Sequence, residues 1–379
     1  MASFRKRIGI LFISDDIGVI YYLVNIVRTL EYLQDFEKPE IIVFYNRECE
    51  KHLSLFSYSY FKAFQINMNS KNRIKLYLKS IVIRKNLFYE MIHSQYTVDA
   101  IFPFNDFPIK IKTNVKLISW IPDFQHKFYP KYFDLKNLVL REIRFRSIIK
   151  NTHTLVLSSY DASNHLNKFY NFKKNIKVQV LQFVSMIKDN KINDYQYVKK
   201  KYNIIDSFFL VSNQFYEHKN HFIVLNAIKE LKNQKYKFQV IFSGKKEDYR
   251  NSLYFPSLLD FITQNNLESH IKILGLIPRE DQLALLRNSL AVIQPSKFEG
   301  WSTIIEDAKT LSHQIICSNL PVHIEQLGNN GFYFDPDSKD ELVKLMRSFL
   351  DGSVHTKKFN YVFDDRVKIF AKSFVDILN

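Results

Sequence analysis

The feature that most constrains the fold of this chain is a regular alternation of short apolar runs with longer amphipathic stretches. Runs such as Ile8–Ser14 and Ala100–Phe104 have the length and composition of buried strands. Between them, Tyr21–Leu33 carries apolar residues at the spacing of one helical face. These are Leu23, Ile26, Val27 and Leu30. Because crossover helices that join buried parallel strands produce this pattern, the sequence predicts a doubly wound α/β domain.

The same alternation begins again after a polar stretch, Lys188 to Lys201, which we expect to act as a hinge. Predicted strands resume at Phe208–Ser212, and a predicted helix covers Thr303–Leu311. A chain of 379 residues also has the length of two ordinary domains. The predicted fold is therefore α/β, with two doubly wound Rossmann-like domains that face a central cleft. The predicted boundaries are 1–186, 187–355 and a C-terminal helix within 356–379 that packs back on the first domain.

Composition excludes several classes of protein. A hydrophobic content of 46% and an aromatic content of 15% are typical of a folded chain. The two cysteines, Cys49 and Cys317, give neither a disulfide framework nor a zinc pattern, which fits a reducing cytoplasm. No apolar stretch reaches the roughly 20 residues of a membrane span. We expect a soluble protein, or at most one attached to a membrane surface.

A formal net charge of +16 favours an anionic partner, such as nucleic acid, lipid headgroups or a phosphorylated small molecule. Part of the excess lies at Arg141, Arg144, Arg146 and Lys150, close in sequence to Phe128. A helix of this kind can rest on an anionic membrane surface or hold a lipid-diphosphate acceptor. A basic face that is merely solvated remains the alternative.

The most informative segment runs from Gln294 to Thr310, where a predicted strand ends, a turn contains Gly300, and a helix begins. A helix N-terminus offers free backbone N–H groups and the positive end of the helix dipole, which suit a diphosphate. Glu299 lies just before this helix and Asp307 lies inside it. The two acids can thus contact different parts of one bound ligand.

The segment from Glu299 to Asp307 resembles the acid-x7-acid signature of the retaining family 4 glycosyltransferases, which have the GT-B fold. In this resemblance Glu299 is the first acid, and Asp307 takes the place of the second, which is usually Glu. Whether Asp307 or the adjacent Glu306 contacts the ribose stays open. The donor-binding residues that the resemblance implies here are Gly300, Trp301, Ser302, Thr303, Glu306 and Asp307.

A second resemblance lies upstream, in the segment Val211–His221. It is similar to the family's strand-to-helix loop that presents an Arg and a Lys, five residues apart, to the donor diphosphate. Lys219 matches the lysine, whereas Gln214 stands where arginine is usual. The resemblance therefore implies that Lys219 and the helix terminus carry most of the leaving-group stabilisation.

Three weaker resemblances complete the expected site. The segment Ile273–Gln282 is similar to the family's base-binding F-x-G segment, which implies contacts from Leu276 and Ile277. The segment Ser119–Pro130 resembles the family's H-D-x-x-x-x-x-P loop. Its candidate catalytic residues are Asp123 and His126. The third candidate catalytic residue is Glu299, in the other domain. Gly18 stands in the first strand-to-helix loop, where the family has a glycine-rich turn that faces the donor.

The resemblance implies a retaining, metal-independent transferase that moves a hexose-type sugar from a nucleotide diphosphate to a glycan or a lipid-linked acceptor. Bacterial O-antigen or capsule synthesis is the usual setting of such relatives. Residues 1–186 would bind the acceptor, and residues 187–355 the nucleotide sugar, which is a substrate, so no cofactor is expected. The expected location is the cytoplasm, with possible peripheral attachment to the inner face of the plasma membrane.

Other interpretations stay open at this point. A GT-B nucleotide-sugar epimerase would use the same cleft, and a basic nucleic-acid-binding protein would explain the charge alone. The sequence Asp335-Pro-Asp337 spells a metal-binding D-x-D, but it directly precedes Ser338–Glu341, which reads as a capping box at the start of a helix. We therefore expect no metal site there.

Overall fold

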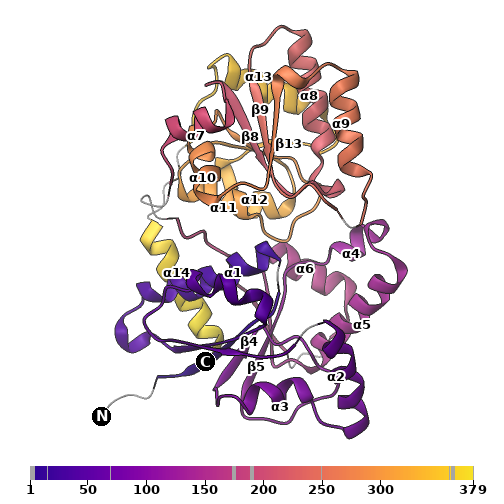
Figure 1. Ribbon diagram of the computed structural model, residues 1–379, viewed down its shortest axis with the longest axis vertical. Helices are drawn as coiled ribbons and strands as arrows, with labels where there is room; N and C mark the ends of the chain where they lie inside the picture. The colour runs from indigo at the N-terminus through magenta and orange to yellow at the C-terminus, as the bar shows by residue number, and fades with distance from the viewer. Residues whose placement is uncertain are drawn as a thin grey trace. The chain divides into compact units, whose positions relative to one another are not determined.

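The computed structural model describes residues 5–14, 16–68, 70–172, 176–187, 192–248, 250–357, 359 and 363–378, which form two compact units (Figure 1). Unit 1 combines Met1–Met186 with Tyr361–Asn379, and unit 2 comprises Ile187–Asn360. Each unit contains one sheet of parallel strands, and helices connect the strands. The predicted α/β, doubly wound architecture is confirmed for both units.

The sheet of unit 1 has seven strands in the order β3-β2-β1-β4-β5-β6-β7. The order reverses between β1 and β4, where Ile8 pairs with Ile41 on one side and with Ala100 on the other. The strands are β1 (Arg7–Phe12), β2 (Glu40–Tyr45), β3 (Phe61–Gln65), β4 (Ala100–Phe102), β5 (Lys116–Ile121), β6 (Thr154–Leu157) and β7 (Lys177–Val180). The edge strands β3 and β7 escape the sequence prediction, because they are only partly buried and lack a continuous apolar run.

The helices of unit 1 are α1 (Ile17–Thr29), α2 (Ser70–Ile83), α3 (Leu87–His93), α4 (Gln125–Phe128), α5 (Leu135–Asn151), α6 (Tyr160–Phe169) and α14 (Phe363–Leu378). Helix α1 begins earlier than predicted, because Asp16 caps it by accepting from the backbone N–H groups of Gly18 and Val19. Its predicted apolar face, Leu23 to Leu30, is buried as expected. Within unit 1, the yellow helix α14 packs along α1 (Figure 1).

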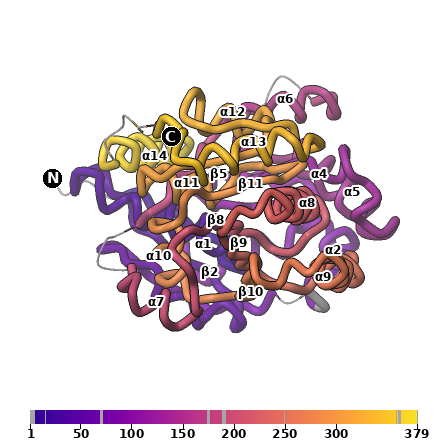
Figure 2. The backbone as a smooth tube through the Cα atoms, turned by 90° about the horizontal axis from the view of Figure 1, so that it is seen from above, coloured from indigo at the N-terminus to yellow at the C-terminus, as the bar shows by residue number. Residues whose placement is uncertain are grey.

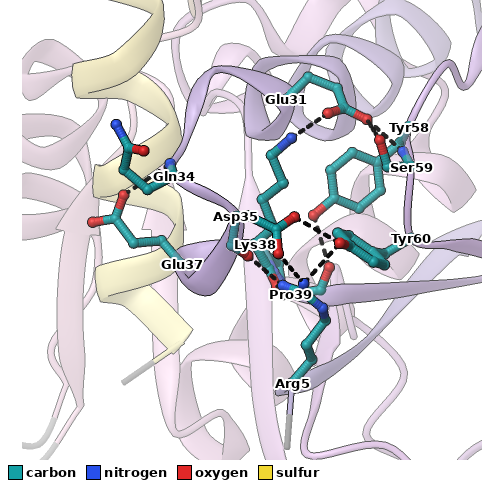
Figure 3. Close-up of polar contacts among 10 residues, drawn as sticks. All are labelled: Arg5, Glu31, Gln34, Asp35, Glu37, Lys38, Pro39, Tyr58, Ser59 and Tyr60. Atoms are coloured by element: carbon teal, nitrogen blue, oxygen red, sulfur yellow. Dashed lines mark hydrogen bonds and ion pairs between the residues drawn. The ribbon is translucent and has the colours of Figure 1, made fainter. Parts of the chain in front are cut away.

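A polar cluster fastens the connection between α1 and β2 to the segment that leads into β3 (Figure 3). Asp35 accepts hydrogen bonds from Arg5 Nη2 at 2.5 Å and from the Tyr60 hydroxyl at 2.6 Å. The Arg5 guanidinium also lies 3.7 Å from the centre of the Tyr60 ring. Close by, Glu31 accepts from the Ser59 hydroxyl at 2.6 Å. These contacts hold the edge of the sheet where apolar packing is thin.

The sheet of unit 2 has six strands in the order β10-β9-β8-β11-β12-β13, which reverses between β8 and β11. The strands are β8 (Phe208–Ser212), β9 (Gln239–Ser243), β10 (Ile271–Gly275), β11 (Val292–Gln294), β12 (Ile315–Ser318) and β13 (Phe332–Phe334). The helices are α7 (Tyr195–Tyr202), α8 (His221–Asn233), α9 (Tyr254–Gln264), α10 (Arg279–Asn288), α11 (Thr303–Thr310), α12 (Pro321–Leu327) and α13 (Lys339–Leu350). Figure 2 shows α8 and α13 close together within this unit.

Strand β8 shows why the second domain could be predicted from the sequence. Phe209 and Val211 belong to one buried cluster, whereas Phe208 and Leu210 belong to another. Because successive side chains of a strand point to opposite faces, β8 is buried on both sides of the sheet. A strand buried on both sides reads as a continuous apolar run, which is the signal that predicted it.

The predicted hinge at residues 188–201 is wrong in its second half. Residues 188–191 lie outside the described part of the chain, but α7 begins at Tyr195 and packs against α10. The packing rests on Asp281, whose side chain is buried. It accepts from Asn193 Nδ2 at 2.7 Å, Lys201 Nζ at 2.7 Å and the Tyr202 hydroxyl at 2.6 Å. A polar sequence is therefore ordered by one tertiary partner.

The pKa of Asp281 predicts how this contact responds to pH. Burial alone would raise the pKa, but hydrogen bonds from Lys201, Tyr202 and Asn193 outweigh it, and the pKa lies below its ordinary value. A carboxyl with a lowered folded-state pKa stabilises the fold fully above its unfolded pKa, about 4 for Asp. That stabilisation is lost as the pH falls through the lower folded-state pKa.

We predict that Asp281→Asn lowers the free energy of unfolding at pH 7 by about 1–3 kcal/mol. The difference between the variant and the wild type becomes smaller at pH 3, where the carboxylate of the wild type is also being protonated. Urea denaturation at both pH values measures it. Asp260→Asn, at an exposed position of α9, is the matched control and changes stability by less than about 0.5 kcal/mol. An equal loss at both pH values would contradict the assignment.

Candidate active site

The candidate site of unit 2 lies where the strand order reverses. Strands β8 and β11 are neighbours, and the chain leaves them in opposite directions along the sheet. The loops that follow them, residues 213–220 and 295–302, meet at the carboxyl edge of the sheet. In open α/β sheets this switch point is where ligands bind. Both sequence motifs lie in these two loops.

Backbone and amide contacts hold the two loops together. Asn220, whose φ is +58°, donates from Nδ2 to the carbonyl of Pro295 at 3.2 Å and to that of Pro336 at 2.8 Å. The amide of Lys297 donates to the carbonyl of His218 at 2.8 Å. Asparagine tolerates the left-handed conformation at residue 220, and its buried side chain serves both neighbouring loops. The loops are thus fixed without a ligand.

An ion pair joins the central residues of the two motifs. Lys219 Nζ lies 2.5 Å from Glu299 Oε1, and both side chains are largely buried. Lys219 ends a short 3-10 helix, η6 (Glu217–Lys219), and Glu299 stands four residues before α11. The structure therefore brings together the lysine and the acid that the sequence places 80 residues apart.

Glu299 is oriented by three residues that the sequence prediction overlooks. Its Oε1 accepts from Gln294 Nε2 at 2.8 Å and from the Ser296 hydroxyl at 2.7 Å. Gln294 is itself held by Asn213, whose Nδ2 donates to Gln294 Oε1 at 2.7 Å. Within the described residues, every hydrogen bond to the Glu299 side chain uses Oε1. These contacts fix the orientation of the carboxylate, so the direction in which it can accept a further hydrogen bond is also fixed.

The histidines around the ion pair are neutral at physiological pH. Burial lowers the pKa of His323 to about 4, although the nearby Glu299 carboxylate opposes the shift. Burial likewise lowers the pKa of His221 to about 3 and that of His218 well below its ordinary value. Of the groups near Glu299, Lys219 therefore carries the positive charge that the three histidines lack at pH 7.

The two acids of α11 have different partners. Glu306 is fully buried and accepts from Lys309 Nζ at 2.9 Å and from Gln326 Nε2 at 3.1 Å. Gln326 also accepts from the Ser302 amide at 3.0 Å and donates to the Ser302 carbonyl. The Ser302 amide is thus already used, which corrects the expectation that it is open to a diphosphate. Thr303, the first residue of α11, is exposed.

Asp307 is held by an arginine that the sequence prediction does not assign. Arg279, the first residue of α10, donates from Nη1 to Asp307 Oδ2 at 2.7 Å and from Nη2 to Oδ1. The carboxylate is 1% exposed, whereas the Arg279 side chain is 22% exposed. Arg279 Nη1 also donates to Gln282, which reaches Ser212 at the end of β8. Of the two groups in this bidentate pair, the guanidinium of Arg279 is therefore the one that a ligand can reach.

The remaining predicted residues of unit 2 line the same edge of the sheet. The turn after β9 packs so closely on Asn213 and Gln214 that a Cβ at Gly244 would lie 2.0 Å from the Asn213 carbonyl oxygen. Leu276 follows β10 and is 68% exposed, whereas Ile277 packs into the core. Gly300 and Trp301 are half-buried in the loop before α11. Leu276 thus marks the open side of these loops, whereas Gly244 allows the turn after β9 to pack against Asn213.

The predicted residues of unit 1 fall into two different environments. Asp123 is partly exposed, and its Oδ1 accepts from Arg141 Nη2 at 3.1 Å. His126 is 3% exposed, its Nε2 lies 3.2 Å from the Tyr170 hydroxyl, and burial lowers its pKa to about 4. This burial gives no support to the catalytic contact expected of His126. The Gly18 amide is engaged by the capping Asp16, so its expected donor contact gains no support.

The Asp335-Pro-Asp337 segment serves the start of α13. Ser338 caps this helix by accepting from the Glu341 amide at 3.3 Å, and Glu341 in return accepts from the Asp335 amide at 2.8 Å. Asp337 pairs with Lys297. The predicted cap by Ser338 is confirmed. The reciprocal half of the predicted capping box is wrong, because the Ser338 amide donates to the Asp335 carbonyl and Glu341 accepts from the Asp335 amide.

We predict that Glu306 is a structural residue. Glu306→Gln leaves the buried Lys309 without its charge partner and lowers the free energy of unfolding by about 2–4 kcal/mol. The matched control, Glu268→Gln, changes an exposed acid of the same unit and has little effect. Thermal and urea denaturation measure both. Unchanged stability together with lost nucleotide binding would instead assign Glu306 to the donor.

Comparison with known proteins shows which proteins this site is similar to. Residues 195–362 match the family model of glycosyl transferases group 1, and this range includes both loops at the switch point. The O-antigen chain mannosyltransferase RfbU of Salmonella typhimurium (strain LT2) is 24% identical over 240 residues. That match covers 63% of this chain and 62% of RfbU, less than two thirds of the relative's length.

Two solved structures resemble nearly the whole chain. Sucrose-phosphate synthase of Thermosynechococcus elongatus is 12% identical with a TM-score of 0.68, and the match covers 99% of this chain and 94% of that one. Anabaena Alr3699/HepE, solved with UDP and glucose, is 15% identical with a TM-score of 0.65, and the match covers 99% and 97%. At these identities the likeness establishes the fold. The chain has the GT-B fold, and its residues 195–362 are similar to the glycosyl transferases group 1 family.

Proposed function

We propose that this protein transfers a hexose-type sugar from a nucleotide diphosphate to a glycan or a lipid-diphosphate-linked acceptor, with retention of the anomeric configuration. The observation that carries this proposal is the Lys219–Glu299 pair at the switch point of unit 2, inside the matched family segment. It unites a cation for a leaving phosphate with an oriented carboxylate for a sugar.

Stabilisation of the leaving diphosphate supplies the main catalytic effect in this proposal. Departure of a nucleoside diphosphate breaks the bond from the anomeric carbon to a phosphate oxygen, so negative charge grows on that oxygen. Lys219 and the N-terminus of α11 at Thr303 provide positive potential from fixed positions. Because these groups are held before the donor arrives, little reorganisation is needed during the reaction.

Glu299 orients the donor sugar in this proposal. Its Oε1 is occupied by Lys219, Gln294 and Ser296. Among the described residues none donates a hydrogen bond to Oε2, so this oxygen can accept one from a sugar hydroxyl. A carboxylate fixed on one side and open on the other selects the position of the bound sugar.

For the nucleoside we propose Asp307 rather than Glu306. Glu306 is fully buried among Lys309 and Gln326, whereas Asp307 is joined to the partly exposed Arg279. The pair of Arg279 and Asp307 would contact the ribose, with the exposed Leu276 against the base.

The acceptor side rests on unit 1. Asp123 keeps a partly exposed carboxylate beside Arg141, which suits it to accept a proton from, or to orient, an acceptor hydroxyl. The names of the relatives support the setting, since RfbU is an O-antigen chain mannosyltransferase. Bacterial surface polysaccharide assembly on the cytoplasmic face of a membrane is the process we propose. The nucleotide, sugar and acceptor linkage are to be found by experiment.

We predict that Lys219→Ala weakens binding of the nucleoside diphosphate that stabilises the wild-type protein. A hydrogen bond to a charged group contributes about 1.5–3 kcal/mol, so the dissociation constant rises roughly tenfold to a hundredfold. Thermal shift with UDP, GDP and dTDP identifies the ligand, and isothermal titration measures the change.

Lys229→Ala is the matched control, because Lys229 is an exposed lysine on α8, the helix that follows Lys219. It should bind the nucleotide as the wild type does. Absence of stabilisation by any of the three nucleotides, with intact protein, would overturn the donor site. Equal binding by Lys219→Ala and the wild type would remove Lys219 from it.

We further predict that transfer continues in EDTA, because Lys219 and α11 hold the leaving group. We also predict that transfer retains the configuration of the donor, as the resemblance of the two motifs implies. Proton NMR of the product reports the anomeric configuration. Incubation of the donor without acceptor separates this proposal from an epimerase, which would release an epimerised donor. An inverted product, or complete loss of activity in EDTA restored by a divalent cation, would contradict the mechanism.

A further inference from the structure

Two helices of unit 1 expose rows of apolar side chains. On α2 they recur at intervals of three and four residues and thus share one side of the helix: Ile74, Leu78, Ile81 and Val82. On α5 they include Leu135, Val139 and Ile143, spaced four apart, with Leu140 beside them. Val82 is 80% exposed and Leu135 81%. Solvent alone gives no reason for such rows, and large exposed apolar patches mark interaction sites.

Most of the charge on these two helices is positive. Helix α2 contains no Asp or Glu, and its exposed side also carries Lys75 and Lys79. Helix α5 contains one acid, Glu142, which pairs with Lys127 at 2.8 Å and with Arg146 at 2.8 Å. Exposed cations on α5 are Lys136, Arg144, Arg146 and Lys150. A partner that binds this surface must therefore offer both negative charge and an apolar layer into which the side chains can insert.

The two helices are fastened to one another through a single acid. Asp106 accepts from Arg73 of α2 at 2.5 Å and lies 3.9 Å from Arg144 of α5. The Ser147 hydroxyl of α5 donates to the carbonyl of Phe107, the next residue. Figures 1 and 2 both place α2 and α5 on the same side of unit 1. The rows thus belong to one region of the unit, which we call the α2/α5 face.

We propose that the α2/α5 face docks on an anionic lipid bilayer, with its apolar rows inserted at the level of the headgroups and its lysines and arginines against the phosphates. An interfacial helix is recognised by apolar residues on one side beside Lys and Arg. Anionic lipid attracts such cations over a distance of about a Debye length. Among the described residues, none of the helices has the length and apolar character of a membrane span.

Other occupants fit this face less well. A second copy of the chain would bring two strongly basic surfaces together, which like-charge repulsion opposes. A nucleic acid would satisfy the cations but would leave Ile74, Leu78 and Val139 exposed. A bilayer satisfies both requirements. The use of the face, to bring the site to a lipid-linked acceptor, rests on the proposed function, but the docking itself does not.

The test compares full-length variants in sedimentation with vesicles of phosphatidylcholine alone and of phosphatidylcholine with 30% phosphatidylglycerol. The wild type is expected to bind the anionic vesicles and to bind them less in high salt. Ile74→Ser with Leu78→Ser and Val82→Ser, and separately Val139→Ser with Ile143→Ser, should each reduce the partition coefficient at least about tenfold, because buried apolar area sets interfacial affinity. Because all of these positions are exposed, the substitutions should leave the fold intact.

The matched control is Leu253→Ser with Leu259→Ser and Ile324→Ser, which removes exposed apolar residues from unit 2 and should leave vesicle binding unchanged. Thermal shift by the nucleoside diphosphate should persist in all variants, so failure of the donor site is detected separately. The proposal is overturned if the wild type ignores anionic vesicles, or if the α2 and α5 variants bind as the wild type does. It is also overturned if these substitutions abolish self-association or binding of nucleic acid instead.

Discussion

The ion pair of Lys219 and Glu299 is the contact on which the candidate site depends, and it exists because of sheet topology. Strands β8 and β11 are neighbours although more than 75 residues separate Ser212 from Gln294, so the loops that follow them end on one edge of the sheet. Asn220, Gln294 and Ser296 then fix the two loops to each other and to the carboxylate. The fold thus brings a cation and an acid into one place without a bound ligand.

Burial and partners divide the acids of this site into separate roles. Glu306 and Asp307 are adjacent in sequence and almost equally buried, yet one faces Lys309 and Gln326 and the other faces Arg279. Sequence alone left the choice between them open, because their partners come from α12 and from α10. The same reasoning gives no support to a catalytic role for His126, since its neutral ring is enclosed by Tyr170 and the core of unit 1.

The basic excess of the chain also gains a physical interpretation. Several of its arginines and lysines on unit 1 lie beside apolar side chains that no other part of the described chain covers, on α2 and α5. Charge by itself is compatible with many partners. Charge beside the exposed Ile74, Leu78 and Val139 is compatible with fewer partners, because these residues also need an apolar environment in which to be buried.

The sequence by itself determined the alternation of strands and helices, the presence of two Rossmann-like units, and the location of Lys219 and Glu299 on strand-to-helix loops. These features rest on local periodicity, which buried strands such as β8 display as continuous apolar runs. Tertiary structure alone decided that Arg279 holds Asp307, that Gln326 takes the Ser302 amide, and that Asp281 orders α7 within a stretch expected to be a hinge. The physical reason is that a hydrogen bond between distant segments leaves no periodic trace in either of them, so only the folded chain shows which polar groups meet.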